Sequence, residues 1–457
     1  MNKDCIELAG RSDPQPPCSA LPLGLSKTLG DQYDLIIIGA GPGGYRAAEL
    51  AAKAGLKVII FECDNVGGTC LNVGCIPTKT YVHSATFAEA RERQQAVVAQ
   101  LRAGVEQILS LPNITLVRER AAFADTHTVS AGGDSFTAPD IIVATGSETK
   151  WLPLPDINDP RVVDSTGLLA LDTLPKRLCI IGAGVIGMEF ASVFNRFGSE
   201  VTVIEYLKEC LPALDSDIAK RLRKTLEKKG ITFRMKTAVS SLADIDADVI
   251  LMATGRKPRL QPDFANAGFE YDERCGITVD DHFRTTVPGI FAIGDVNGRM
   301  MLAHAAEYQA KMVIDDILAH RSQQANGHSS PLTPHFSLNT SHPSIIPAAI
   351  FTNPEAACVG PTEDQLKADG VVYECRKAFY RANGKALAMN ETEGMVKLFS
   401  EPDAGLILGC HAFGAHSADM VQEVSALMCR DTTVAHLRNM VHIHPTLGEI
   451  LLTAAES

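Results

Sequence analysis

Two stretches of this chain share one pattern of apolar and polar positions. The first, YDLIIIGAGPGGYRAAELAAKAGLKVIIFE, runs from Tyr33 to Glu62, and the second, RLCIIGAGVIGMEFASVFNRFGSEVTVIE, runs from Arg177 to Glu205. In each, a short apolar run leads into glycines, then into a pattern typical of a helix, and then into a second apolar run. Short apolar runs bounded by glycine predict buried strands. Each stretch therefore predicts a strand, a glycine turn, a helix and a second strand.

Three glycines and one acidic residue lie at the same relative positions in both stretches. They are Gly39, Gly41, Gly44 and Glu62 in the first, and Gly182, Gly184, Gly187 and Glu205 in the second. In such a turn the first glycine permits the tight bend, the second lets a pyrophosphate approach the backbone, and the third allows close helix packing. The helix N-terminus stabilises the phosphates, and the acid accepts hydrogen bonds from ribose hydroxyls. One such motif is weak evidence, but two matching copies predict two dinucleotide sites.

A second landmark follows each stretch and shows that the two copies differ in length. IIVATGS contains Thr145 and Gly146, and VILMATGRKP contains Gly255 at the corresponding place. More residues separate the acid from this landmark in the first copy, and the surplus includes GGTCLNVGCIPTK, which holds Cys70 and Cys75. The cysteine pair is therefore inserted beside the first dinucleotide site.

Three kinds of site could use Cys70 and Cys75. A structural zinc site needs four ligands at set spacings, and no such companions lie nearby in the sequence. A passive staple would close too short a loop to restrain much unfolded-chain entropy. A redox-active disulfide fits best, because a short loop can be strained and hence reducible. The segment IPTKTYVHSATFAEARERQQAVVAQL predicts one helix after the pair, and its N-terminal region would favour thiolates.

Composition and charge argue against several functions. The net charge of -12 argues against a nucleic-acid partner, because phosphate binding needs clustered lysine and arginine. The apolar runs are far shorter than the roughly 20 residues of a membrane span, so no membrane partner is expected. The 12 cysteines are otherwise scattered singly, which indicates a reducing, cytoplasmic environment. Residues 1–30 lack the features of a secretory or mitochondrial targeting segment and are predicted to be a mobile leader.

With these motifs the chain resembles the pyridine nucleotide-disulfide oxidoreductases over residues 31–457. TTVPGIFAIGDV is similar to the family's segment in which an aspartate, here Asp295, holds the flavin ribityl chain. MLAH is similar to the segment that follows it, where backbone near Ala303 would touch the flavin. HIHPTLGE resembles the C-terminal catalytic signature, with His444 as the acid–base and Glu449 as the carboxylate that orients it.

These residues also have structural interpretations. Asp295 could be a turn residue, since Gly-Asp is common in turns. His444 could be a buried core histidine, or could hold a metal together with His442, but no cluster of acids and cysteines lies nearby, so no metal site is predicted. A histidine followed by a carboxylate five residues later, across a proline-containing turn, suits acid–base catalysis.

The resemblance implies a fold, a division into domains and a set of binding residues. The expected fold is α/β, with two Rossmann-like dinucleotide-binding domains and a C-terminal α+β dimerisation domain. The expected segments are the leader at 1–30, an FAD-binding domain with the redox disulfide at 31–148, an NAD-binding domain at 149–270, a central segment completing the FAD site at 271–333 and the dimerisation domain at 334–457. The residues expected to bind FAD are Gly39, Gly41, Gly44, Glu62, Gly68, Thr69, Lys79, Ala121, Thr145, Gly146, Asp295 and Ala303. The residues expected to bind NAD are Gly182, Gly184, Gly187, Glu189, Glu205, Val239 and Gly255. Lys79 and Glu189 match a family ion pair beside the flavin.

Within this family, the segments GGTCLNVGCIPTK, MLAH and HPTLGE are most similar to those of the dihydrolipoamide dehydrogenases. Glu205 is followed by Tyr206 and not by arginine, which suits NAD and not NADP. The resemblance implies oxidation of protein-bound dihydrolipoamide to lipoamide, with reduction of NAD⁺ through Cys70, Cys75 and FAD. The lipoyl carrier would be the acyltransferase of a 2-oxo acid dehydrogenase or a glycine cleavage carrier. A homodimer is also implied, in which His444 serves the partner subunit's disulfide.

Two alternatives remain, an NAD(P)H-dependent reductase of another disulfide, similar to glutathione reductase, and a non-catalytic flavin-binding docking subunit. The chain also departs from the typical enzyme. Ala305, Gln309 and Ala310 stand where Lys, Glu and Gly are usual, and KTAVSSLADIDADVI leaves little room for the usual β-hairpin of the NAD-binding domain. The polar segment at 321–344 is predicted to be a linker.

Overall fold

The structure is a computed structural model, and it describes residues 33–326 and 345–457. The predicted leader at 1–30 and residues 327–344 of the predicted linker lie outside the described residues. The chain divides into two compact units. The first unit comprises Met1–Lys150 and Gly255–Leu332, and the second comprises Trp151–Thr254 and Thr333–Ser457.

A parallel sheet of five strands forms the centre of the first unit, in the order β17-β7-β1-β2-β3. The strands are β1 (Leu35–Ile38), β2 (Val58–Phe61), β3 (Ile114–Val117), β7 (Asp140–Val143) and β17 (Ile290–Ala292). In the central strand β1, Leu35 pairs with Val58 on one side and with Asp140 on the other. All four residues of β1 are buried, as expected for a parallel strand made of an unbroken apolar run. The strand order is that of a doubly wound dinucleotide fold, whose ligands bind where the order reverses.

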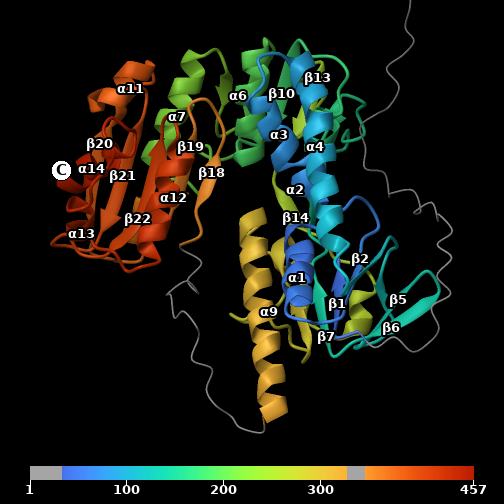
Figure 1. The fold of residues 1–457 in the computed structure, drawn as a ribbon. Coiled ribbons are helices and arrows are strands. Elements are labelled where there is room, and N and C mark those ends of the chain that lie inside the picture. The colour runs from blue at the N-terminus through green and yellow to red at the C-terminus, as the bar shows by residue number, and fades with distance from the viewer. Residues whose placement is uncertain (1–32, 327–344) are drawn as a thin grey trace, which may run out of the picture. The chain divides into compact units, whose positions relative to one another are not determined.

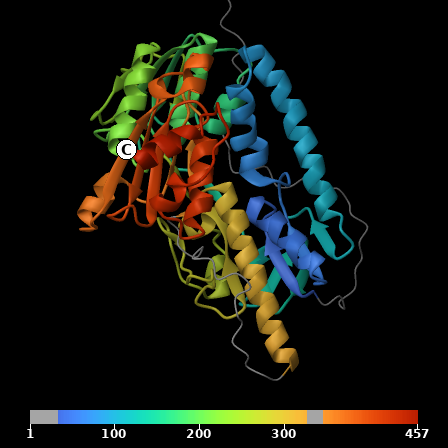
Figure 2. The ribbon, with the colours of Figure 1, turned by 60° about the vertical axis from the view of Figure 1, so that its left-hand side comes forward.

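Helices α1 (Pro42–Lys53) and α9 (Ala303–Asn326) lie side by side in the first unit (Figures 1 and 2). Small residues allow this close approach, since a Cβ atom on Gly43 would lie 3.4 Å from the Cβ atom of Ala306. The helix α9 continues to Asn326, so the first residues of the predicted linker are helical, and the prediction was wrong there.

The helix predicted as one piece after the cysteine pair is two helices, α3 (Cys75–Val82) and α4 (Phe87–Leu109). Thr86 caps α4, because its side chain accepts a hydrogen bond from the backbone N–H of Glu89. The smaller elements of the first unit are α2 (Gly68–Val73), β4 (Ala122–Phe123), β5 (Thr128–Ala131), β6 (Asp134–Thr137), β8 (Ser147–Thr149), β14 (Arg256–Pro258), α8 (Phe264–Ala267), β15 (Tyr271–Asp272), β16 (Gly276–Ile277) and η1 (Gly294–Asn297).

The second unit contains a parallel sheet of the same kind, in the order β12-β11-β10-β13-β9. Its elements are β9 (Val162–Val163), α5 (Ser165–Leu169), β10 (Arg177–Ile181), α6 (Val185–Phe197), β11 (Glu200–Ile204), α7 (Ser216–Lys228), β12 (Thr232–Arg234) and β13 (Val249–Met252). The first unit carries the antiparallel strands β4, β5 and β6 between β3 and β7, whereas residues 235–248, all of them described, contain no strand between β12 and β13. The predicted shortening of the second copy is therefore confirmed.

An antiparallel sheet with helices makes up the C-terminal part of the second unit, in the order β18-β19-β22-β21-β20. Its elements are β18 (Ala348–Ile350), β19 (Ala356–Val359), α10 (Glu363–Ala368), β20 (Glu374–Phe379), η4 (Tyr380–Ala382), α11 (Gly384–Met389), β21 (Met395–Ser400), β22 (Ile407–Phe413), α12 (Ser417–Met428), α13 (Val434–Arg438) and α14 (Glu449–Glu456). The helix α12 packs on β19 and β22, and α14 packs on β20 and β21. The predicted α/β fold with a C-terminal α+β domain is confirmed. Among the described residues, no helix is both long and apolar enough to cross a membrane.

A buried ionic cluster joins α7 to the C-terminal sheet within the second unit. The Nζ atom of Lys397 lies 2.7 Å from Asp215 Oδ1 and 2.5 Å from Glu363 Oε2. The backbone N–H of Asp215 donates to Nδ1 of His411 at 2.9 Å. Lys397, Asp215 and His411 are almost completely buried, and Nε2 of His411 lies 3.3 Å and 3.1 Å from the carbonyl oxygens of Gly360 and Pro361. The buried polar groups of the cluster are therefore paired with protein atoms.

Candidate active site

The first glycine turn leaves room for a pyrophosphate at one glycine only. A Cβ atom on Gly39 would lie 2.4 Å from the carbonyl oxygen of Ala144, and one on Gly44 would lie 1.8 Å from that of Gly39. Both positions therefore require glycine, for the bend and for helix packing. A Cβ atom on Gly41, the residue that precedes α1, would have its nearest neighbour 4.0 Å away, at the Cα atom of Gly68. The space over Gly41 at the N-terminus of α1 fits the pyrophosphate of FAD.

The second glycine turn has the same construction. A Cβ atom on Gly182 would lie 2.3 Å from the carbonyl oxygen of Ala253, and one on Gly187 would lie 2.0 Å from that of Gly182. Among the described residues other than its two chain neighbours, no atom lies within 4 Å of the corresponding position on Gly184, which precedes α6. This turn therefore fits the pyrophosphate of a nicotinamide nucleotide in the same way.

The acid at the end of each second strand is bound to its own glycine turn, which sequence reasoning missed. Glu62 accepts hydrogen bonds from the backbone N–H groups of Ala40 at 2.8 Å and Asp64 at 2.9 Å. Glu205 likewise accepts hydrogen bonds from the backbone N–H groups of Ala183 at 2.6 Å and Leu207 at 2.8 Å. Burial raises the pKa of the Glu62 carboxyl. Each carboxylate oxygen has a second lone pair, so both acids can still accept ribose hydroxyls.

Asp295 lies in η1 at the centre of a hydrogen-bonded network. Its Oδ2 atom accepts a hydrogen bond from the Ser147 hydroxyl at 2.5 Å, and Ser147 in turn accepts one from Nε of Arg256 at 2.7 Å. Gln309 stabilises the same short helix, because its Oε1 atom accepts hydrogen bonds from Gly294 N–H at 2.7 Å and from the Asn297 amide at 2.9 Å. Sequence reasoning noted Gln309 only as a departure from the family and did not find Ser147 or Arg256.

The cysteine pair spans two short helices. Cys70 lies in α2 and Cys75 is the first residue of α3, with Gly74 between the helices. A Cβ atom on Gly74 would lie 2.8 Å from the carbonyl oxygen of Thr69, so only glycine fits this tight connection. The Cys70 side chain is hydrogen-bonded to Cys75. Two sulfur atoms in hydrogen-bond contact are close enough for disulfide exchange.

The environment of Cys70 favours its protonated form. The hydrogen bond to Cys75 is the largest influence and raises the pKa of the Cys70 thiol, and burial raises it further. The positive charge of Lys79 acts in the opposite direction. The Cys70 side chain is therefore favoured as a protonated thiol hydrogen-bonded to Cys75.

His444 and Glu449 form a hydrogen-bonded pair at the start of α14. The Nδ1 atom of His444 lies 2.9 Å from Glu449 Oε1, and Glu449 Oε2 accepts the backbone N–H of Thr446 at 2.9 Å. The Thr446 N–H and then His444 lower the pKa of the Glu449 carboxyl. Because Nδ1 faces a carboxylate, it carries the proton, and the lone pair lies on Nε2. With 79% of its side chain exposed, His444 leaves that lone pair accessible at the surface of the single chain.

The other predicted FAD residues lie in the first unit. Gly68 and Thr69 begin α2, Ala121 is buried just before β4, and Ala303 begins α9. Thr145 and Gly146 follow β7, where the Thr145 hydroxyl donates to the carbonyl of Arg259 at 3.0 Å. The predicted NAD residues Val239 and Gly255 lie in the loop between β12 and β13 and just after β13, respectively.

Lys79 belongs to the first unit and Glu189 to the second, so their pairing stays a prediction. Glu189 is buried in α6, and its Oε1 atom accepts the backbone N–H of Phe351 at 2.9 Å. Glu189 is therefore a buried, hydrogen-bonded side chain of α6.

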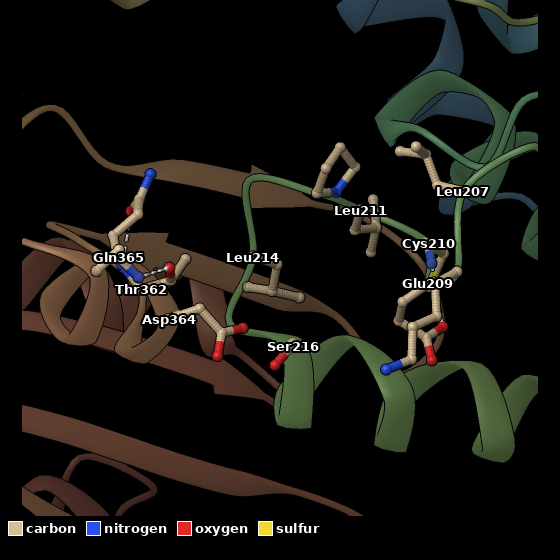
Figure 3. A pocket seen from close by; sticks show the side chains of 12 residues that line it. Leu207, Glu209, Cys210, Leu211, Leu214, Ser216, Thr362, Asp364 and Gln365 are labelled. Atoms are coloured by element: carbon tan, nitrogen blue, oxygen red, sulfur yellow. Dashed lines mark hydrogen bonds between the residues drawn. The ribbon is translucent and has the colours of Figure 1, made fainter.

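A groove of about 480 Å³ lies beside α7 and α10 in the second unit (Figure 3). Leu211 and Leu214 line one side and Thr362 and Gln365 the other. None of the predicted catalytic or cofactor-binding residues lines it, although Leu207, which does, donates its backbone N–H to Glu205. Among the described residues, no group of three or more histidine, cysteine or acidic side chains could hold a metal.

Two family models match the chain. The model of the pyridine nucleotide-disulphide oxidoreductases matches residues 33–310, and the model of their dimerisation domain matches residues 346–455. Together the two models match most of both described parts of the chain.

Individual proteins are similar over almost the whole length. "Dihydrolipoyl dehydrogenase 1, mitochondrial" of Arabidopsis thaliana is 34% identical over 484 residues, which cover 95% of this chain and 92% of that protein. Dihydrolipoyl dehydrogenase of Geobacillus stearothermophilus is 35% identical over 468 residues, which cover 93% of this chain and 96% of that protein. Among solved structures, a Cu(II) complex of the HOCl-induced flavoprotein disulfide reductase RclA from Escherichia coli has a TM-score of 0.82 and 31% identity, covering 92% of this chain and 98% of that one.

Proposed function

The chain belongs to the pyridine nucleotide-disulphide oxidoreductases, and on this basis we propose that it oxidises protein-bound dihydrolipoamide to lipoamide with reduction of NAD⁺. Its cofactors are FAD and NAD(H), as in the family. The observation that carries the proposal is the presence of both halves of a thiol-oxidising site, the Cys70–Cys75 pair and the His444–Glu449 pair. A docking subunit without turnover would need neither pair.

Different residues of the chain would bind the different parts of FAD and NAD. Gly41, Glu62 and Asp295 would hold the pyrophosphate, adenosine ribose and ribityl chain of FAD, and Gly184 and Glu205 would hold the corresponding parts of NAD. When bound, FAD accepts two electrons from the cysteine pair and delivers them to NAD⁺ as a hydride. The proposal keeps the domain boundaries predicted from the sequence.

In the proposed reaction, Nε2 of His444 removes the proton from one substrate thiol. The thiolate attacks Sγ of Cys70, the Cys70–Cys75 bond breaks, and Cys75 leaves as a thiolate. The second substrate thiol then attacks the mixed disulfide, which releases lipoamide and leaves its proton on Cys70. Two electrons pass from the substrate to the cysteines, one proton rests on His444 and the other on Cys70. The raised pKa of Cys70 and its hydrogen bond to Cys75 support this final state.

A homodimer belongs to the proposal, because the chain contains the family's dimerisation domain. Val441 and Ile443 lie in the loop that carries His444 and are 98% and 79% exposed in the single chain. Apolar side chains so exposed beside an acid–base pair support insertion of this loop into a second copy, where His444 would serve the partner's disulfide. The expected carrier is a lipoyl-bearing acyltransferase or glycine cleavage carrier, and the expected location is the cytoplasm.

The test is an anaerobic assay of the FAD-loaded protein with dihydrolipoamide plus NAD⁺, and separately with NADH plus glutathione disulfide. We expect rapid NADH formation in the first assay and little turnover in the second. His444→Gln should slow thiol oxidation by about 10²–10⁴-fold, the usual contribution of a general base. Reduction of ferricyanide by NADH needs no thiol base and should not change. Faster turnover of glutathione disulfide would instead favour the second candidate, a reductase of another disulfide, which the likeness to RclA supports.

A further inference from the structure

A second histidine–carboxylate pair lies next to His444 and has no part in the reaction described above. The Nε2 atom of His442 lies 3.0 Å from Oε1 of Glu423, which projects from α12. The His442 side chain is only 9% exposed, whereas that of His444 is 79% exposed. The two histidines, separated by one residue, therefore have opposite environments.

The loop that carries His444 has few other attachments. Among residues 441–445, His442 is the one residue that is not exposed. Within the described chain, no backbone–backbone hydrogen bond involves these five residues. Two further hydrogen bonds hold the loop, one between His444 and Glu449 and one from the Thr446 hydroxyl to the carbonyl of Ile443 at 2.7 Å. Within the described chain, the hydrogen bond between His442 and Glu423 is therefore the one that ties this loop to α12.

The pair also lies directly against the turn into α14. A Cβ atom on Gly448 would lie 3.5 Å from Cδ2 of His442 and 3.8 Å from Oε2 of Glu423. The next residue, Glu449, is the carboxylate that orients His444. The Nδ1 atom of His442 is buried and has no hydrogen-bond partner in the described structure, so the ring is oriented through Nε2 alone.

We infer that Glu423 and His442 are positioning residues, which hold the loop so that His444 and Glu449 meet in the geometry needed for proton transfer. This inference rests on the proposed function of His444. His442 Nε2–H donates to Glu423, so an acceptor oxygen at position 423 is required, whereas its negative charge is not. A catalytic group displaced by about 1 Å loses up to about a hundredfold in rate, so such anchoring has a measurable effect.

The test compares Glu423→Ala, Glu423→Gln, His442→Ala and the double alanine variant in the FAD-loaded dimer. We expect Glu423→Ala to lower kcat for dihydrolipoamide oxidation by about tenfold to a hundredfold, with the KM for NAD⁺ and ferricyanide reduction unchanged. Glu423→Gln should restore kcat, because its amide oxygen can accept the same hydrogen bond. The double variant should be no slower than either single one, since both remove one interaction.

Amide hydrogen exchange of residues 441–447 gives a readout that needs no substrate, and it should accelerate in Glu423→Ala and return in Glu423→Gln. Asp419→Ala is the matched control, because Asp419 lies on the same helix and pairs with His416, but both side chains are exposed. The inference would be overturned if Glu423→Ala had the kcat and the amide hydrogen exchange of the wild type. It would also be overturned if Glu423→Gln were as impaired as Glu423→Ala. If the wild type does not oxidise dihydrolipoamide, the proposed function fails, and hydrogen exchange alone decides whether the pair anchors the loop.

Discussion

At the scale of single residues, the reactivity of Cys70 is set by neighbours with opposite effects. Cys75 and burial raise the pKa of the Cys70 thiol, and Lys79 lowers it. A protonated thiol is a poor nucleophile, and the charge of Lys79 opposes protonation of Cys70. This predicts that Lys79 influences the ionisation of Cys70, in addition to its predicted pairing with Glu189.

Lys79→Gln should therefore raise the pKa of Cys70 further. In a Cys75→Ser background, where Cys70 is the sole thiol of the pair, we expect alkylation of Cys70 by iodoacetamide at neutral pH to slow by about tenfold, which corresponds to one pKa unit. The rate is followed by peptide mass spectrometry as a function of pH. Lys53→Gln is the control, because Lys53 is an exposed partner of Glu49 on α1. An unchanged pH midpoint in Lys79→Gln would show that Lys79 has no influence on the thiol.

The reacting residues were predictable from the sequence, whereas their supports were not. The His444–Glu449 pair is close in sequence and forms the expected hydrogen bond. Ser147, which binds Asp295, is 148 positions away from it in the chain. Serine and arginine are ordinary surface residues in most sequences, so nothing local marks Ser147 and Arg256 as members of the network around Asp295. Only the fold brings them together.

At the scale of elements, the ionic cluster around Lys397 fastens α7 and α10 to strand β21. Removing one member of a buried ion pair leaves the others charged and unpaired, which usually costs about 3–5 kcal/mol. Lys397→Ala should therefore lower the free energy of unfolding by about this amount, measured by urea denaturation of the dimer at neutral pH. Lys377→Ala is the matched control. Lys377 lies on the neighbouring strand β20, opposite Lys397 in the strand register, and its side chain is exposed. Equal losses in both variants would contradict a specific role for the cluster.

The same cluster predicts a pH dependence. The hydrogen bond from Lys397 is the largest influence on Glu363 and lowers the pKa of its carboxyl to about 2. A depressed carboxyl pKa stabilises the fold above the unfolded value of about 4.3, and this contribution is lost as the pH falls from there towards 2. The difference in unfolding free energy between wild type and Glu363→Gln should therefore shrink over this range. A difference that stays constant with pH would refute the linkage.

His411 adds a second contribution at higher pH. Burial lowers the pKa of its imidazole, so the unfolded chain binds more protons than the folded chain as the pH falls below about 6.5. Stability should begin to fall there, before Glu363 titrates.

The elements themselves followed from local patterns with two exceptions. One is the start of the predicted linker, which is helical because α9 continues to Asn326. Both strand–turn–helix–strand units, including the glycine positions, were predicted because short apolar runs and glycines act locally. The break between α3 and α4 was missed, because the segment is rich in helix-forming residues. A local signal was nevertheless present. Thr86 and Glu89 have the spacing of a helix cap, and Ala85 N–H donates to Glu89 Oε2 at 2.8 Å.

At the scale of the whole molecule, the repeat predicted two copies of one strand–turn–helix–strand unit, and the family resemblance predicted the C-terminal domain. The connection between α7 and the C-terminal sheet could not be predicted, because Lys397 and Asp215 are 182 positions apart in the sequence. In the sequence alone, each residue is indistinguishable from an ordinary charged surface residue. Their burial depends on how the C-terminal sheet packs against the nucleotide-binding part of the same unit. Such packing has no local pattern in the sequence.

The proposed dimer makes a prediction that only two chains together can test. If each site uses the cysteines of one chain and His444 of the partner subunit, a dimer of one Cys70→Ala chain and one His444→Ala chain has one intact site. Random exchange in an equal mixture makes about half of all dimers mixed. Dihydrolipoamide oxidation should therefore recover to about a quarter of the wild-type rate from two inactive variants.

The matched control is a mixture of Cys70→Ala and Cys75→Ala. Both substitutions damage the cysteine half of a site, so each site of the mixed dimer lacks one thiol and no activity should return. Native mass spectrometry of the two mixtures verifies that mixed dimers form to the same extent. Recovery in the first mixture and none in the second requires that the exposed loop around His444 completes a site on another chain. Failure of both, with mixed dimers present, would assign His444 to the cysteines of its own chain.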